Sequence, residues 1–87
     1  MANAGIRPAG AQNVDIITIT SLMISNQSAT LSGVPAIPVK AVVAAGGLEQ
    51  TYSIDFTISG NIISWASMGL GSILSVGDKL IVQYFTL

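Results

Sequence analysis

Residues 52–59 (YSIDFTIS) alternate apolar and polar side chains with a period of two, the pattern of a strand with one buried face. A second short apolar segment, residues 62–65, follows after Gly60 and Asn61. Gly and Asn both tolerate a positive φ, which the tight turns of two-residue hairpins require. The pattern therefore predicts a β-hairpin with strands over 52–59 and 62–65.

Two further segments, residues 14–20 (VDIITIT) and 79–86 (KLIVQYFT), are rich in β-branched and aromatic residues and are predicted to be strands. Gly77-Asp78 predicts a turn before the second. Both strands carry apolar side chains on both faces: Val14 and Ile16 opposite Ile17 and Ile19 in the first, and Leu80, Val82 and Tyr84 opposite Ile81 and Phe85 in the second. An antiparallel strand usually buries only one face, so we expect the other face to contact a second subunit.

The first half of the chain is less regular. Residues 22–25 are expected to continue the first strand past a bend, and residues 29–31 to return as a short strand after a turn at 26–28. Residues 32–38 contain two prolines, which cannot donate to a sheet, so a loop or edge segment is expected there. Residues 39–45 (VKAVVAA) fit either a strand or two helical turns, and the β surroundings favour the strand.

A chain of 87 residues forms one domain, and the predicted strands place it over residues 14–87. Residues 1–13 are rich in small residues and lack periodicity, so they cannot form a core of their own. They are interpreted either as a frayed terminus or as an arm that orders on a neighbouring subunit. The predicted fold class is all-β, a small antiparallel β-sandwich or barrel with a flexible N-terminal arm.

Residues 66–75 form a loop expected to fold Met68, Leu70, Ile73 and Leu74 back over the core. The expected core contains Ile17, Ile19, Phe56, Ile63, Trp65, Leu80 and Val82.

The composition changes this picture, because apolar residues make up 51% of the 87 residues and charged residues only 8%. An ordinary soluble domain has about 25% charged residues, and a monomer needs charges of both signs to stay dispersed. We therefore expect other protein to cover much of the surface. The candidate interface residues are Ile6, Arg7, Val14, Ile16, Ile81 and Phe85.

Catalytic chemistry is poorly represented. The chain has no His and no Cys, which excludes Ser-His-Asp and Cys-His catalysis and the usual zinc sites. The four carboxylates are expected on solvent faces or in turns. Trp65 and Tyr84 could form a carbohydrate platform, but their strand positions favour the core. We expect a non-enzymatic protein with no cofactor and no metal.

The same composition limits the partners. Three basic residues and a net charge of −1 leave no electrostatic footprint for nucleic acid. The most apolar stretch, residues 39–48, is too short for a membrane-spanning helix and contains Lys40, so no membrane partner is expected. Self-association remains as the main support for so small a chain.

Two motifs resemble a module of tailed-bacteriophage virion proteins. The first, Tyr52-Ser-Ile-Asp-Phe-Thr-Ile-Ser-Gly-Asn-Ile-Ile-Ser-Trp65, is similar to their Y-x-h-x-h-x-h-x-G-N-x-I-x-W hairpin, where h is apolar. The second, Gly77-Asp78-Lys79-Leu-Ile-Val-Gln-Tyr84, is similar to the G-D-x-h-x-h-x-Y strand that follows it. The resemblance covers about residues 50–86 and implies a β-meander, with no catalytic residues to carry over.

The resemblance implies a structural protein of the virion. The expected function is that of a capsid cement (decoration) protein on the capsid surface, which self-associates, most simply as a trimer, and clamps subunits of the major capsid protein. The alternative is a tail, fibre or baseplate module, including one that binds carbohydrate.

Overall fold

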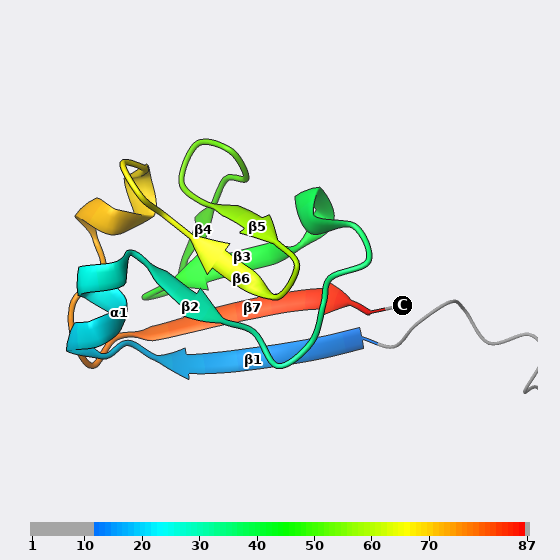
Figure 1. The fold of residues 1–87 in the computed structure, drawn as a ribbon, viewed down its shortest axis with the longest axis horizontal. Helices are drawn as coiled ribbons and strands as arrows, with labels where there is room; N and C mark the ends of the chain where they lie inside the picture. Colours follow the sequence, from blue (N-terminus) through cyan, green and yellow to red (C-terminus); the bar gives the residue numbers. More distant parts are fainter. Residues whose placement is uncertain (1–11, 87) are drawn as a thin grey trace, which may run out of the picture.

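All named strands of the computed structural model, which describes residues 12–86, pair antiparallel in two sheets (Figure 1). The four-stranded sheet has the order β1 (Gln12–Thr18), β7 (Lys79–Phe85), β3 (Val42–Ala45) and β4 (Leu48–Gln50). The three-stranded sheet has the order β2 (Ser28–Thr30), β6 (Ile62–Ser64) and β5 (Thr57–Ser59). The fold is therefore mostly β, as predicted. β1 begins at Gln12, two residues before the predicted strand, and residues 1–11 lie outside the described part of the chain.

The predicted continuation of the first strand over residues 22–25 is wrong, because Ser21–Asn26 form the α-helix α1. Thr20 caps its N-terminus by accepting a hydrogen bond at Oγ1 from the Met23 N–H (3.2 Å). Gln27 ends the helix with a φ of 56°. The two caps provide hydrogen bonds for backbone groups at the helix ends, which stabilises the helix against the strand that the composition favours. Such capping is not visible in the composition.

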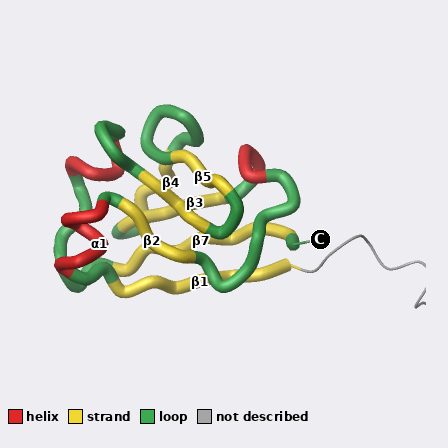
Figure 2. Tube along the Cα trace, in the orientation of Figure 1, coloured by secondary structure: helices red, strands yellow, loops and turns green. Residues whose placement is uncertain are grey.

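Residues 39–45 combine both structures that the sequence allowed. Pro38–Lys40 form the 3-10 helix η2, with the proline in its first turn, and Val42–Ala45 form β3. Proline is favoured at a helix start because its fixed φ suits that position and its missing N–H would be unpaired there. The short helices, including the 3-10 helix η3 (Gly69–Ser72), lie in connections at the periphery of the sheets (Figure 2).

The hairpin of β5 and β6 is confirmed, with Gly60-Asn61 as its two-residue turn. Gly60 has a φ of 59°, whereas Asn61 is not among the described residues with positive φ, which is the pattern of a type II′ turn. The first half of the predicted strand is wrong. Residues 51–55 form a turn in which Asp55 Oδ2 accepts the Thr51 N–H (2.8 Å), and Ile54 is 68% exposed.

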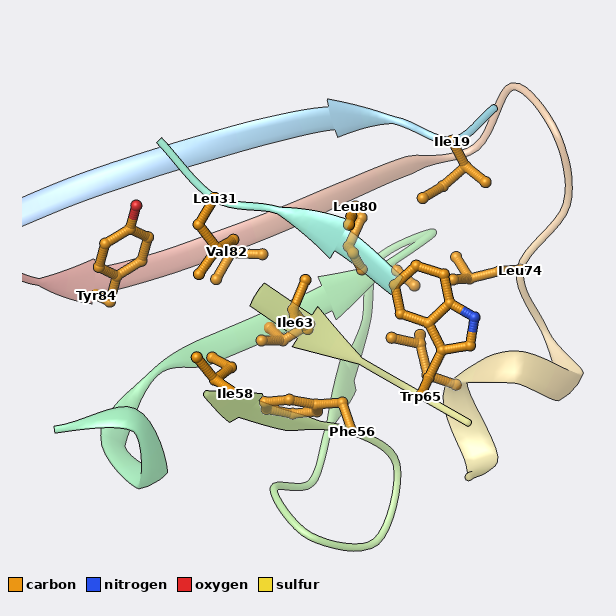
Figure 3. Close-up of a cluster of buried hydrophobic side chains, with 14 residues drawn as sticks. Ile19, Leu31, Phe56, Ile58, Ile63, Trp65, Leu74, Leu80, Val82 and Tyr84 are labelled. Atoms are coloured by element: carbon orange, nitrogen blue, oxygen red, sulfur yellow. The ribbon is translucent and has the colours of Figure 1, made fainter. Parts of the chain in front are cut away.

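Buried apolar side chains from both sheets form one core (Figure 3). Every predicted core residue is buried except Ile17, which is partly buried against the core. Leu70 and Leu74 of the 66–75 segment are buried and Met68 is partly buried, as expected, but Ile73 is exposed. Trp65 is only 1% exposed, so it belongs to the core. The full set is Ile19, Ala29, Leu31, Val43, Ala45, Phe56, Ile58, Ile63, Trp65, Leu70, Leu74, Leu80, Val82 and Tyr84.

Candidate interaction surface

One side of the four-stranded sheet packs on the core, and we call the other side the outer face. Burial alternates along β1, β7 and β3, so every second residue of each strand points away from the core. The register then assigns the members of this face. They are Gln12, Val14, Ile16 and Thr18 of β1, Lys79, Ile81, Gln83 and Phe85 of β7, Val42 and Ala44 of β3, and Glu49 of β4.

Six of the eleven residues of the outer face are apolar. Ile16 pairs across to Ile81, which pairs in turn with Ala44, and together they form an apolar row across three strands. Ile16 is 65% exposed and Phe85 is 59% exposed. Lys79 and Glu49 lie toward the ends and the β4 edge, whereas Gln83 lies on the middle strand between Val14 and Val42. A surface of mixed apolar and polar residues is the ordinary composition of a non-obligate protein–protein contact.

The structure brings together four of the predicted interface residues. Val14, Ile16, Ile81 and Phe85 all lie on the outer face, from two adjacent strands. The other two candidates, Ile6 and Arg7, lie outside the described residues. The outer face as an interface stays a prediction.

Sequence reasoning missed Val42, which is 45% exposed on the same face. Residues 42–45 (VVAA) are all apolar, so the sequence held no signal for which of them points outward. Once β3 is a strand beside β7, Val42 necessarily shares a face with Gln83, its partner in the register.

A polar cluster occupies the inner side of the same sheet, where β1 and β7 meet the segment after β2. Asp15 Oδ2 accepts hydrogen bonds from Tyr84 Oη (2.6 Å) and from the Ser32 N–H (2.9 Å). Asp15 Oδ1 accepts from Ser32 Oγ (2.5 Å). Tyr84 Oη in turn accepts from Asn13 Nδ2 (2.8 Å) and from the Gly33 N–H (3.0 Å). The cluster ties three separate parts of the chain together.

The hydrogen bonds in this cluster lower the pKa of Asp15. Partial burial raises the pKa of this carboxyl, but the hydrogen bonds from Ser32 and Tyr84 outweigh that effect, so the pKa lies below its ordinary value. The expectation that Asp15 lies on a solvent face holds only in part, because Asp15 is on the core side of β1 yet only partly buried. Asp15 shares its strand parity with Ile17 and Ile19, so the sequence did contain the signal that it points inward. Asp55 and Asp78 do lie in turns, where each accepts a backbone N–H.

The described residues offer little for catalysis. No group of three or more potential metal ligands of the His, Cys, Asp or Glu type occurs between residues 12 and 86. An open hollow of about 480 Å³ lies between the β3–β4 turn and the start of β7. Its walls are mostly glycine and aliphatic residues, with Asp78 and Lys79 at the turn.

Comparison with known proteins assigns no family to the chain. No protein-family model matches the chain, no curated protein matches its sequence and no solved structure matches its fold. Within residues 12–86 there is no helix with the length and apolar character needed to cross a membrane.

Proposed function

We propose that the protein is a non-enzymatic structural subunit of a tailed-bacteriophage virion. In this proposal it is a capsid cement protein that associates with itself and stabilises the shell by clamping neighbouring major capsid subunits. The exposed apolar outer face of the four-stranded sheet is the observation that supports this function. A sheet with apolar side chains on both sides is expected where both sides are covered.

The low charge supports the same proposal. Only 8% of the residues are charged, and residues 12–86 contain many exposed aliphatic side chains besides those of the outer face. On soluble proteins, contiguous exposed apolar patches mark interaction sites. Burial of apolar surface contributes roughly 25 cal/mol per Å², from which the costs of association are subtracted.

The area of the outer face limits what it can do alone. Three adjacent strands of up to seven residues span roughly 14 by 23 Å, from the spacing of strands and residues in a sheet. A standard interface buries about 800 Å² per partner. We therefore propose that further contacts add to the outer face, among them an N-terminal arm ahead of β1 that carries Ile6 and Arg7.

The finer fold belongs to the same proposal. Two separate sheets of four and three strands favour a small β-sandwich over a closed barrel. The alternative of a tail or fibre module that binds carbohydrate loses its candidate platform, because Trp65 and Tyr84 are both buried. The cement protein needs no such platform, since its contacts are apolar and extended.

The test is binding of the purified chain to shells assembled from the major capsid protein of the phage that encodes it. We expect Val42→Lys/Phe85→Lys to lose binding by at least roughly tenfold, because two charges would be desolvated in the contact. Ile54→Lys is the control, since Ile54 is also exposed but lies in the turn before β5. Equal binding by all three proteins would contradict a role for the outer face.

A second variant tests the arm. Deletion of residues 1–11 leaves β1 intact, because β1 begins at Gln12. We expect weaker attachment to shells with an unchanged circular dichroism spectrum. If the truncated chain attaches as well as the full chain, the arm hypothesis is wrong while the outer face remains under test.

A further inference from the structure

β1 is a long strand with one open side. It is seven residues long and, among residues 12–86, pairs only with β7, whereas the other edge strands of the two sheets, β2, β4 and β5, have three residues each. Figure 1 shows β1 along the border of the four-stranded sheet. An unpaired edge of this length is a template for another strand.

The backbone of β1 directs alternate residues to this open side. The Ile19 N–H donates to the Asp78 carbonyl (2.8 Å) and the Ile19 carbonyl accepts from the Gly77 N–H (2.8 Å), so this residue points toward the chain leading into β7. Alternate residues of an antiparallel strand direct their N–H and C=O groups to opposite sides. The residues whose backbone groups face the open side are therefore Gln12, Val14, Ile16 and Thr18.

The devices that usually protect an edge are missing from β1. The strand contains no lysine, no proline and no bulge in its register with β7. Its single charge, Asp15, is held on the inner side by Tyr84 Oη and by Ser32. That carboxylate is therefore engaged within the fold and does not block the open edge.

We propose that two copies of the chain pair through β1 in antiparallel orientation, with Ile16 on the two-fold axis. The proposal rests on the proposed function, of which self-association is a part. In this register Ile16 lies opposite Ile16 of the second copy, and Val14 lies opposite Thr18 of the second copy. The residues that pair are those whose backbone groups face the open edge.

Two observations select this register. A two-fold axis at Asp15 would place two carboxylates directly opposite each other, and like charges in that position are destabilising. An axis at Ile16 instead joins the apolar row of Ile16, Ile81 and Ala44 to the same row of the second copy. The outer faces then form one surface across eight strands.

Edge pairing also enlarges the outer face, which is too small in one copy to form a standard interface. The joined face is about twice as wide, which brings it toward the roughly 800 Å² that each partner contributes to a standard interface. A two-fold contact gives dimers, or even-numbered assemblies if the outer face adds a second contact. It therefore competes with the trimer expected from the sequence resemblance.

The first experiment uses the unmodified chain. Light scattering after size exclusion should give the mass of a dimer, and amide exchange should show at least roughly tenfold protection at Val14, Ile16 and Thr18 compared with a diluted, monomeric sample. The Ile17 amide points to β7 and serves as the control, protected in both samples. A trimer with rapid exchange at Ile16 would overturn β1 pairing and leave self-association standing. A monomer at all concentrations would overturn both.

The second experiment tests the register, using the fact that the chain has no cysteine. Hydrogen-bonded residues of antiparallel strands have Cα atoms about 5.5 Å apart, within the range that a disulfide spans. Under mild oxidation we expect Ile16→Cys to form a covalent dimer at least roughly tenfold faster than Val14→Cys, whose two copies would lie about 14 Å apart. Gln83→Cys, on the outer face of β7, is the second control.

The alternatives give different results. Faster cross-linking of Val14→Cys would overturn the register, and cross-linking confined to Gln83→Cys would overturn edge pairing in favour of packed outer faces. All three positions are at the surface, so the substitutions leave the core unchanged.

Discussion

Tyr84 is at once a core residue and the centre of a polar cluster. Its ring is buried beside Val82, while its hydroxyl donates to Asp15 and accepts from Asn13 and from the Gly33 backbone. Such a group is costly to remove because each partner loses a hydrogen bond where solvent has limited access. The cluster joins the first strand, the last strand and the segment after β2.

We expect Tyr84→Phe to lower the free energy of unfolding by about 1–3 kcal/mol at neutral pH, measured by urea denaturation. The difference from the wild type should shrink in acid. The pKa of Asp15 is lowered in the folded state, so its contribution is complete above the unfolded value of about 3.9 and disappears as the pH falls through the folded pKa. Tyr52→Phe is the control, since the Tyr52 hydroxyl has no described hydrogen bond, and it should change stability by less than about 0.5 kcal/mol.

The sequence could predict which way Tyr84 points but not what its hydroxyl binds. Alternation places Leu80, Val82 and Tyr84 on one face, and the structure agrees. Ser32 and Gly33, however, are about fifty residues away in the chain and lie in a segment with no periodicity. Only the three-dimensional path of that segment brings them to the end of β7.

At the level of elements, the β5–β6 turn carries the clearest local constraint. Gly60 has a φ of 59°, and a Cβ at this position would meet nothing within 4 Å. Replacement by alanine therefore introduces backbone strain without a clash. We expect Gly60→Ala to cost about 1–2 kcal/mol in thermal or urea unfolding. Asn61→Ala, at the neighbouring turn position without a positive φ, should cost less, and equal losses would contradict the assigned turn.

Elements were predictable where one pattern dominated. Residues 57–64 have both alternation and turn residues, and their hairpin is confirmed. Residues 22–25 (LMIS) show no alternation, and they form a helix that Thr20 caps. In residues 51–55 the alternation continued, but the Asp55 side chain closes a turn onto the Thr51 N–H. A side chain that competes for backbone groups in this way is not visible in a hydrophobic pattern.

For the whole molecule, association and stability are linked. A chain that is folded as a dimer becomes more stable as its concentration rises, because mass action favours the bound state. We expect the Tm of the wild-type chain to rise with protein concentration. Ile16→Lys would place two ammonium groups at the two-fold axis, so its Tm should be lower and independent of concentration. Ile54→Lys should behave as the wild type, and a concentration-independent wild type would contradict association.

The scarcity of charge predicted covered surface, and alternation in two strands predicted which residues form the outer face. The arrangement of the strands was not predictable in the same way. β7 lies between β1 and β3, so the last strand is central to the larger sheet although it is made last. This order depends on which strands pair with each other and on which of their faces lies toward the core. The pattern of residues along the sequence does not specify the pairing.

The central position of β7 has one more consequence. Gln12 lies directly opposite Phe85 in the register, so the described chain enters and leaves the fold side by side. A domain with this geometry can be carried as an insertion in a loop of a host protein, or be circularly permuted. A short linker between these two points, with new ends opened at Gly46-Gly47, would keep every strand intact. A cut at this turn would thus leave all four strands that form the outer face uninterrupted.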